Sequence, residues 1–487
     1  MNPIRRIYTP LLVTLVMFTL VFQGFLAGPA STARAATGST TAAGPIFLPL
    51  LRSNSHPART INAPYFGTDD VLQVHFVEMA IAWFGRVDST ANYTDIRVGY
   101  NNTGLTIYLN TFDRRIWWNE NPTPAELTKY DSATLYLDLD GNTGGVPTTH
   151  AYRFDLQLYW FGDKLDFQAG YWGDGSGWTP LAQPFTAGSS WVGLNAPNSN
   201  GDARGWWSSF TIPFSSLGLS GAPAQGSAWG MGLAVHDRDD EAGTAIPDQT
   251  WPEGLASTRP STWGRVAFGL PSYTPPNKAP AGTVTIRNKL NGAVVTDAAV
   301  GGTIGNLCSG DPNFIWNGWG NANFSSANGF NLQNQSALGD WPCFAKYFLT
   351  LPLDSLPRGK AILSAKLTLH EWGGSDPTQA QPSLIQVLSL SDDWNESTLT
   401  WNNAPLAMEN VGRAWVDPTG WPGWPGIPCV WDVTYAVVKA YNGGQPLRLG
   451  MYSADFDMHS GKYFYTSDEE DLNAVGRPTL EVTWAEP

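Results

Sequence analysis

Hydrophobic and polar residues alternate along many short segments of this chain. The alternation is regular in segments 105–110, 135–140, 152–160, 366–370 and 479–484. A period of two predicts β-strands with one buried face and one wet face. Gly and Pro clusters interrupt these runs at short intervals, and no long helical pattern competes with them. We therefore predict an all-β protein with two tandem antiparallel β-sandwich domains, jelly-roll-like in architecture.

Changes in composition divide the chain into domains and connecting segments. A chain of this length is expected to hold two or three domains. Segment 271–282 contains four prolines, which is typical of an extended, semi-rigid linker. The predicted domains then cover about 60–270 and 283–486. Segment 37–59 is small and polar apart from an apolar island at 46–51, and we interpret it as a flexible stem.

Residues 1–36 have the features of a secretory signal peptide. Arg5 and Arg6 supply positive charge, an apolar run follows at 11–22, and residues 33–35 read Ala-Arg-Ala, a typical cleavage site. The apolar run is shorter than the roughly 20 residues that span a bilayer. We therefore predict secretion from a bacterial cell, to the medium or the cell surface, without membrane insertion after cleavage.

The charge balance limits the partners that can be expected. The full chain has a formal net charge of −14, which becomes −17 when the three arginines of the predicted signal segment are removed. Nucleic acid and anionic lipid both require a basic footprint, so we expect neither as a partner. A neutral polysaccharide remains compatible, as does an acidic one contacted with the help of a cation. Acidity is also common in proteins that need only be soluble.

Aromatic residues are abundant, with 23 Trp, 17 Tyr and 22 Phe, whereas only 14% of residues are charged. Aromatic rings stack on the apolar faces of sugars as they do on cations and other rings. Many of them lie in Gly-, Asn- and Asp-rich segments, and loops on a rigid scaffold commonly carry function. The predicted sugar-binding residues are Trp117, Trp118, Tyr171, Trp172, Asp174, Trp178, Trp206 and Trp207. The alternative for each ring is that it packs against an end of the sandwich.

In the second half of the chain, further tryptophans pose the same choice between packing and binding. They are Trp316, Trp319, Trp341, Trp372, Trp421 and Trp424.

Two acidic segments are candidates for a structural calcium site. The candidate ligands are Asp138, Asp140 and Asn142 in one segment and Asp237, Asp239 and Asp240 in the other. Closely spaced carboxylates suit Ca²⁺, a hard cation that takes six to eight oxygen ligands. The first segment is not an EF-hand loop, because Thr149 stands where that loop has Glu. Solvated carboxylates in turns are the alternative.

The three cysteines, Cys308, Cys343 and Cys429, all lie in the last third of the chain. In an oxidising compartment two of them are expected to pair. A bond between Cys308 and Cys343 would tie down the irregular segment between them, while Cys429 remains an alternative partner. The spacings do not resemble those of a zinc site.

Sequence motifs for catalysis are absent. None of the six histidines lies in an H-E-x-x-H motif, and the chain has neither a G-x-S-x-G elbow nor a Gly-rich phosphate loop after a strand. We therefore predict no enzymatic activity. Carboxylates are numerous, however, and two of them can reach glycosidase spacing in a large sandwich. A glycoside hydrolase or polysaccharide lyase that uses Asp237, Asp239 or Glu253 is thus an alternative.

Residues 60–270 resemble the family 9 carbohydrate-binding modules. The resemblance rests, in order and spacing, on segments 131–140, 210–219, 229–239, 251–253 and 260–269. It implies a β-sandwich that clamps a terminal sugar between two aromatic rings and often holds calcium. It also implies an association with secreted polysaccharide-degrading enzymes. No residue of this chain is assigned to the clamp.

Residues 283–486 resemble the DNRLRE-type module, which is also classed among carbohydrate-binding modules and occurs on bacterial surface proteins. The matching segments are 346–357, 362–369, 394–405, 430–434 and 477–483. The most specific of them has tryptophans at 394 and 401, which we expect to hold the fold together. Two departures are Lys346, where an arginine is usual, and a Cys- and Trp-bearing insertion at about 306–345.

These features together predict a secreted, non-catalytic protein that binds polysaccharide, or a cell-wall or matrix glycan, through aromatic-lined loops. The apolar island at 46–51 and the unpaired thiol favour an alternative, a cell-surface or matrix adhesin with a protein partner. The hydrolase or lyase described above is the third hypothesis.

Overall fold

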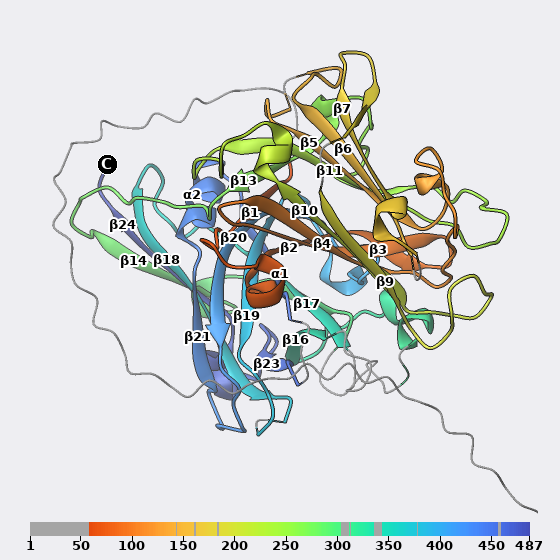
Figure 1. Ribbon diagram of the computed structural model, residues 1–487. Helices are drawn as coiled ribbons and strands as arrows, with labels where there is room; N and C mark the ends of the chain where they lie inside the picture. The colour runs from red at the N-terminus through yellow and green to blue at the C-terminus, as the bar shows by residue number, and fades with distance from the viewer. Residues whose placement is uncertain are drawn as a thin grey trace, which may run out of the picture. The chain divides into compact units, whose positions relative to one another are not determined.

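β-Strands are the main regular structure of the described chain (Figure 1). The computed structural model describes residues 58–142, 144–159, 162–182, 185–302, 311, 313–335, 343–376, 378–455 and 459–487. The predicted signal segment, the apolar island at 46–51 and all of the predicted stem except Ala58 and Arg59 lie outside these residues. No helix in the described ranges is long and apolar enough to cross a membrane.

The first half contains thirteen of the described strands. They are β1 (Thr60–Ala63), β2 (Ala80–Asp88), β3 (Ala91–Tyr100), β4 (Gly104–Phe112), β5 (Ser132–Asp138), β6 (Ala151–Gln157), β7 (Gln168–Gly173), β8 (Trp178–Leu181), β9 (Thr186–Val192), β10 (Gly205–Pro213), β11 (Ala228–His236), β12 (Gln249–Trp251) and β13 (Gly264–Phe268). Strands β2-β3-β4-β10-β9 form a five-stranded antiparallel sheet. It packs against the first-half strands of a second, larger sheet.

The second half contains the remaining described strands. They are β14 (Gly282–Arg287), β15 (Thr296–Val300), β16 (Gly329–Gln335), β17 (Cys343–Leu351), β18 (Ala361–Gly374), β19 (Ser383–Leu390), β20 (Ala407–Val416), β21 (Ile427–Asp432), β22 (Leu447–Ser453), β23 (Lys462–Tyr465) and β24 (Thr479–Ala485). One layer pairs β15, β17, β22, β19 and β20 in that order. The facing layer groups β14, β24, β18, β21, β23 and β16.

Helices are short and peripheral in the described chain. The two α-helices are α1 (Val71–Val74) and α2 (Thr434–Asn442). The 3₁₀ turns are Phe76–Glu78, Leu127–Lys129, Lys164–Phe167, Phe214–Leu217, Pro260–Thr262, Leu290–Gly292, Phe314–Trp316, Trp319–Asn321, Glu396–Thr398 and Asp471–Gly476. The strands therefore carry the architecture.

Side chains at alternate strand positions fill the space between the sheets. Leu105, Ile107 and Leu109 of β4 are fully buried in a core that also contains Leu135 and Leu137 of β5. A separate core fills the second half between its two layers. The predicted all-β class with antiparallel sheets is confirmed. The exception is β1, which pairs in parallel with β13 and meets β20 at one position.

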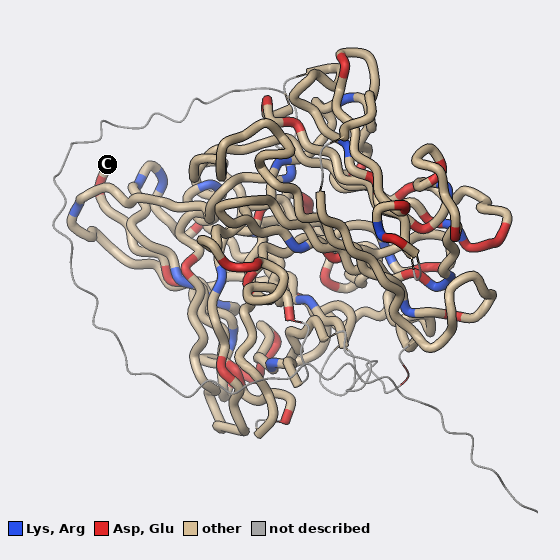
Figure 2. The backbone as a smooth tube through the Cα atoms, in the orientation of Figure 1, with Lys and Arg blue, Asp and Glu red and all other residues tan. Residues whose placement is uncertain are grey.

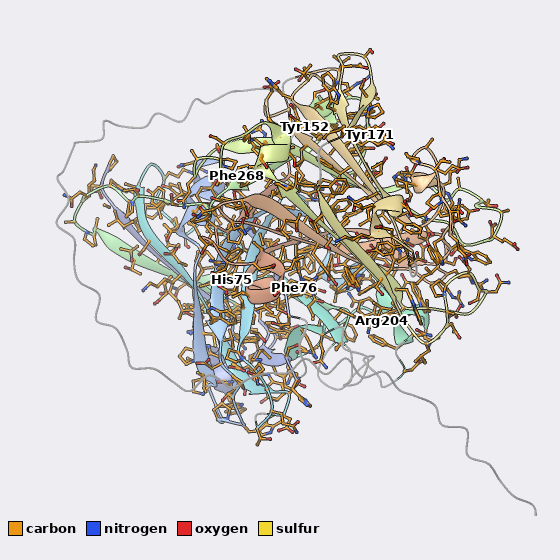
Figure 3. The ribbon with its side chains drawn as sticks, in the orientation of Figure 1. His75, Phe76, Tyr152, Tyr171, Arg204 and Phe268 are labelled. Atoms are coloured by element: carbon orange, nitrogen blue, oxygen red, sulfur yellow. The ribbon has the colours of Figure 1, made fainter. Side chains whose placement is uncertain are left out.

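The two halves are in direct contact, because Pro57–Pro487 forms one compact unit. A third apolar core lies between them, with Trp83 of β2 and Tyr93 of β3 packed among Phe348, Trp401 and residues of β22. Buried Arg204, labelled in Figure 3, has its guanidinium carbon 5.8 Å from the centroid of the Phe344 ring. The outer face of the five-stranded sheet thus packs on the second half.

The predicted linker is hydrogen-bonded to the second half. The hydroxyl of Tyr273 donates to the Ile362 carbonyl at 2.8 Å, and the Lys278 ammonium donates to the Glu486 carbonyl at 3.0 Å. The segment is therefore held to the second half at two points, and its interpretation as an extended, semi-rigid linker stays a prediction. The predicted boundaries at about 60–270 and 283–486 remain a prediction.

Lys346 is a buried charged residue at the contact between the halves, where Asp95 and Arg97 are buried as well. It is fully buried, and its Nζ lies 3.8 Å from the ring centroid of Trp401, 4.1 Å from Trp83 and 4.4 Å from Tyr93. The ammonium donates to the Tyr93 hydroxyl at 2.5 Å, which donates in turn to Asp95 at 2.6 Å. Burial lowers the pKa of Lys346 well below its ordinary value. The side chain links both halves through cation–π contacts and hydrogen bonds.

Candidate functional site

Five aromatic side chains, two of them exposed and three half-buried, form a cluster on the second half, which we call the aromatic platform. Its members are Trp372, Trp421, Trp424, Tyr463 and Tyr465. The ring centroid of Trp372 lies 5.1 Å from that of Trp421, 5.7 Å from Tyr463 and 5.9 Å from Tyr465. Trp424 is hydrogen-bonded to Tyr465. Trp421 and Trp424 are 70% and 57% exposed, so their rings are open to a ligand.

Two antiparallel strands and one loop build this platform. Tyr463 and Tyr465 lie two positions apart on β23, so their side chains share one face of the sheet. The neighbouring strand β18 has an irregular register beside Gly373. The loop 417–426, between β20 and β21, places Trp421 over this glycine. A Cβ at Gly373 would lie 3.1 Å from the indole ring, so the missing side chain allows the close approach.

A row of amides fixes the edge of the platform along β16. Asn331, which is paired with Tyr463, donates to Gln333 at 2.8 Å, and Gln333 donates to Gln335 at 2.8 Å. All three amide side chains are buried. The ladder stiffens the side-chain face of β16, and the backbone pairing of Asn331 with Tyr463 joins this strand to β23.

A buried carboxyl lies next to the platform on β18. Glu371 is 1% exposed, and its Oε1 has no hydrogen-bond partner among the described residues. The thiol of Cys429 is 3.9 Å from its Oε2. Burial, with a further contribution from Asp417, raises the pKa of Glu371 to about 8. The side chain is therefore mainly protonated at neutral pH.

The raised pKa of Glu371 predicts a pH-dependent stability. Between about pH 4.5 and pH 8 the folded state holds a proton that the unfolded chain has lost, so this residue's contribution declines as the pH rises. Gln at position 371 mimics the protonated form. In the wild type, the free energy of unfolding should fall between pH 5 and pH 8. In Glu371→Gln this fall should be smaller by about a few kcal/mol.

Urea denaturation at several pH values measures this effect. The matched control is Asp417→Asn, which removes an exposed carboxylate nearby and is expected to reduce the slope only slightly. A slope that stays unchanged in Glu371→Gln would contradict a proton held at this site.

Three predicted sugar-binding tryptophans lie in the protein interior. Trp206 is fully buried, and its indole N–H donates to Asp113 at 3.0 Å. Trp117 and Trp118 are 9% and 7% exposed, and Trp118 packs against Phe167. Contrary to prediction, these rings present no face to a sugar, because neighbouring side chains already cover them.

The remaining predicted rings are half-buried. Trp207 stacks on Tyr108 with ring centroids 5.7 Å apart, and Trp172 packs against the core of the first half. Trp178 stacks in parallel on Trp263 at 6.4 Å. Tyr171 lies on β7, where Figure 3 labels it, beneath the guanidinium of Arg153 at 5.1 Å. The hairpin β7–β8 is thus the part of the first half where the structure keeps predicted rings near the surface.

Asp174 has a local structural role at the tip of this hairpin. Its Oδ1 accepts hydrogen bonds from the backbone N–H groups of Ser176 and Gly177 at 2.8 and 2.7 Å, and from the Ser176 hydroxyl. These bonds lower the pKa of Asp174 to about 2. The predicted ligand contact of this carboxylate stays a prediction, but the carboxylate already stabilises the turn.

Three buried carboxylates converge in the first half. Oxygen atoms of Asp113, Asp131 and Asp237 lie within 4.8 Å of one another. Oxygens bound to one Ca²⁺ at 2.3–2.6 Å are at most about 5 Å apart, so the spacing suits this cation. Burial and repulsion from other triad carboxylates raise the pKa of Asp113 and Asp131 well above the ordinary value, and burial with repulsion from Asp239 raises the pKa of Asp237 to about 7.

The hydrogen bonds of this carboxylate triad also fit a cation. Asp131 accepts backbone N–H bonds from Trp117 at 2.7 Å and Arg238 at 2.8 Å, which orient both of its oxygens. Asp237 is 2% exposed, and its Oδ1 has no hydrogen-bond partner among the described residues. Oriented oxygens with spare lone pairs are what a hard cation requires.

The structure places some of the predicted calcium ligands at the carboxylate triad and others away from it. Asp237 belongs to the triad, and Asp239 lies close enough to raise the pKa of Asp113 and Asp237. Asp240 instead accepts from the backbone N–H of Thr244 at 2.9 Å.

The other predicted segment forms a hydrogen-bonded turn. Asp138 accepts backbone bonds from Asp140 and Asn142, and Asp140 pairs with His150 at 2.9 Å. The Asn142 amide donates to the carbonyls of Trp263 and Gly264. Asp138 and Asp140 therefore already have protein partners, in line with the alternative of turn carboxylates, whereas Oδ1 of Asn142 has no hydrogen-bond partner among the described residues.

The cysteines differ in state. Cys343 is disulfide-bonded, and Cys429 has a free thiol. Burial raises the pKa of the Cys429 thiol to about 12, so it is not a reactive thiolate. Cys308 lies outside the described residues, and its pairing with Cys343 stays a prediction.

One arrangement in the first half has the order of a nucleophilic triad. Asp248 lies 3.0 Å from His236 Nδ1, and His236 Nε2 lies 3.0 Å from the Thr134 hydroxyl. Thr134 is fully buried, and its hydroxyl donates to Asp155 at 2.7 Å. A substrate cannot reach it, so this arrangement is structural. Of the predicted catalytic acids, Asp237 is buried in the carboxylate triad and Glu253 pairs with Arg59.

The sequence raised Trp372, Trp421 and Trp424 as possible binding residues and Asp237 as a calcium candidate, but it did not join the aromatic platform or the carboxylate triad into sites. A signal for the platform existed, because Trp421 and Trp424 lie in a Gly- and Pro-rich loop and Tyr463 and Tyr465 share one strand face. No local signal joins the residues of the triad, which come from three distant segments.

Charged residues are scattered over the surface. Figure 2 shows Lys and Arg as separate positions among strands and loops, with no continuous basic stripe along the described chain. The aromatic platform is therefore a more distinctive surface feature than any charge pattern.

Comparison with known proteins links the second half to carbohydrate-binding modules. The profile of carbohydrate-binding module family 96 matches residues 312–483, which include the whole platform. No curated protein sequence matches the chain significantly. The sequence therefore resembles a carbohydrate-binding module, as predicted, although the DNRLRE type itself is not shown.

Solved structures show weaker similarity. A family 9 carbohydrate-binding module from Caldicellulosiruptor kristjanssonii in complex with cellotriose has 14% identity and a TM-score of 0.32, covering 44% of this chain and 95% of that one. Its complex with glucose has 16% identity and a TM-score of 0.31, covering 45% and 100%. These scores are too low to support a conclusion, and the family 9 resemblance of residues 60–270 stays a prediction.

Proposed function

We propose that this is a secreted, non-catalytic protein that binds polysaccharide, with the aromatic platform as its main contact surface. The observation that carries the proposal is the exposure of Trp421 and Trp424 beside three further rings. Water-exposed indoles arranged in a cluster mark interaction surfaces, because a monomer gains little by exposing them. The similarity of residues 312–483 to a carbohydrate-binding module supports sugar as the ligand.

The expected affinity is modest. If each stacked ring contributes on the order of 1 kcal/mol and hydrogen bonds add to this, affinity falls in the micromolar-to-millimolar range. Such affinity suits a protein that meets a repeating polymer at high local concentration. The hairpin carrying Tyr171 offers the first half a smaller contact of the same kind.

Calcium is proposed as a structural cofactor of the first half. Asp113, Asp131 and Asp237 would hold the ion, with Asp239 at its edge. The ion would supply positive charge among carboxylates whose ionised forms burial otherwise disfavours. Its role is to hold together the segments that carry these residues.

The main test of sugar binding removes one exposed ring. Trp421→Ala is expected to weaken polysaccharide affinity about tenfold, or about 1.4 kcal/mol, because a stacking surface is lost while the fold is kept. Native electrophoresis in gels cast with hydroxyethyl cellulose, xylan, galactomannan or polygalacturonate measures the affinity from the retardation. Gels with calcium and with chelator separate any dependence on the ion.

The matched control is Trp415→Ala, which removes an exposed tryptophan that has no ring contact with the platform in the described chain. It should leave retardation unchanged. If no gel retards the wild-type protein, the proposal fails, and capture of a protein partner that tolerates Trp421→Ala would support the adhesin. Release of reducing or unsaturated sugars would instead support the hydrolase or lyase.

A further inference from the structure

We infer that the aromatic platform binds an internal stretch of an extended, uncharged polysaccharide chain and does not hold a chain end. This inference rests on the proposed function. It specifies how the polymer lies on the surface and which polymers are accepted.

The spacing of the rings around Trp372 does not suit a clamp. A sugar held between two facing rings needs the ring planes about 7–8 Å apart, twice the contact distance of carbon atoms. Trp372 is 5.1 Å from Trp421, 5.7 Å from Tyr463 and 5.9 Å from Tyr465. The planes are inclined by 42°, 43° and 29°, so Trp372 faces none of these rings in parallel. None of these three pairs can clamp a sugar, and the proposed ligand lies on top of them.

The rings also extend beyond the size of one sugar. Tyr463 and Tyr465 are two residues apart on a strand, which separates their positions by about 6.6 Å. Trp424 lies beside Tyr465, to which it is hydrogen-bonded. Trp421 lies beside Trp372, in contact with that ring. A ligand that contacts all five rings must therefore have more than one sugar unit.

Charge near the platform disfavours an acidic polymer. Asp417 lies in the same loop as Trp421 and is exposed. The cation on β23, Lys462, is fully buried, and its ammonium donates to the carbonyls of Gln381 and Ser460 and to the Ser383 hydroxyl. All three of its protons are thus in use, and it cannot pair with the carboxylate of a uronic acid. A neutral chain meets no such penalty.

Oligosaccharides of different length test this mode of binding. The first gel panel identifies the retained polymer, and isothermal titration calorimetry then uses its oligosaccharides of one to six units, each in native and borohydride-reduced form. We expect affinity to increase at least tenfold from one unit to six, and reduction of the chain end to change it less than twofold. Polygalacturonate is expected to bind at least tenfold more weakly than the neutral polymer.

Tyr463→Ala tests whether this ring contacts the longer chains. It should reduce the gain from added sugar units more than it reduces the affinity for the shortest binding oligosaccharide. Thermal unfolding checks that the variant is folded, and Trp415→Ala, outside the platform, should bind every length as the wild type does.

The possible failures are distinguishable. A monosaccharide that binds as tightly as the hexamer, or binding that end-reduction abolishes, would show a terminal site and overturn the inference while sugar binding stands. Stronger retention by polygalacturonate would overturn the uncharged class. No retention by any polymer would refute the proposed function itself.

Discussion

Trp401→Ala is expected to lower the free energy of unfolding by about 3–5 kcal/mol, the usual cost of removing a buried tryptophan. Trp401 is 3% exposed, and its ring centroid lies 4.5 Å from that of Trp319 and 4.8 Å from that of Tyr93. It also covers the ammonium of Lys346 at 3.8 Å. The cavity would open at the contact between the halves, so both halves should lose stability together.

Guanidinium denaturation followed by tryptophan fluorescence and by near-ultraviolet circular dichroism measures this change. We expect one transition, displaced to lower denaturant in both signals. Trp421→Ala is the matched control, because it removes the same side chain from a position that is 70% exposed and should cost at most about 0.5 kcal/mol. Two separate transitions, with only one displaced, would show that the halves unfold independently.

The sequence was informative about which side chains of a strand enter the core. Alternation at Leu105, Ile107 and Leu109 correctly predicted β4, because each of these side chains enters the same core. The wet face expected on the other side of this strand was wrong, since the whole of β4 is buried. The same logic applied to β10 would have placed Trp206 inside with Phe210 and Ile212, which are fully buried. The Gly- and Asn-rich residues before this strand instead suggested a loop, and the ring was predicted as a ligand contact.

Packing between sheets could not be predicted from the same pattern. Trp83 and Tyr93 lie on the face of the five-stranded sheet that a single sandwich would expose to water. They are buried because the second half covers that face. Local alternation records which side chains share a face and does not record what lies against it. The contact around Lys346 was therefore invisible in the sequence, although the residue itself stood out.

The functional residues illustrate the same limit. Exposed Trp421 and buried Trp401 both follow polar, turn-forming segments, and only the folded chain distinguishes a ring that packs from one that faces water. Asp113, Asp131 and Asp237 are separated by many residues, and each alone resembles an ordinary strand-end acid. Their convergence is a property of the tertiary structure, and it turns three unremarkable carboxylates into a candidate cation site.

Calcium is expected to stabilise the protein through these three carboxylates. At a free concentration 100 times the dissociation constant, an ion that binds only the folded state adds about 2.7 kcal/mol. Thermal unfolding followed by circular dichroism, in calcium and in chelator, measures the shift. Asp131→Asn and Asp237→Asn should lose most of it. Asp240→Asn, which changes a predicted ligand outside the triad, should keep it.

Comparing the wild type with Asp237→Asn, in calcium and in chelator, distinguishes a calcium ligand from a purely structural carboxylate. Without a cation, carboxylates buried within 4.8 Å of one another destabilise the ionised fold, so Asp237→Asn should be at least as stable as the wild type in chelator. In calcium the wild type should become the more stable protein, because the substitution removes a charged ligand. A variant that is less stable by the same amount in both conditions would indicate a purely structural carboxylate. If Asp237→Asn is at least as stable as the wild type in chelator but less stable in calcium, an ion must bind at this residue.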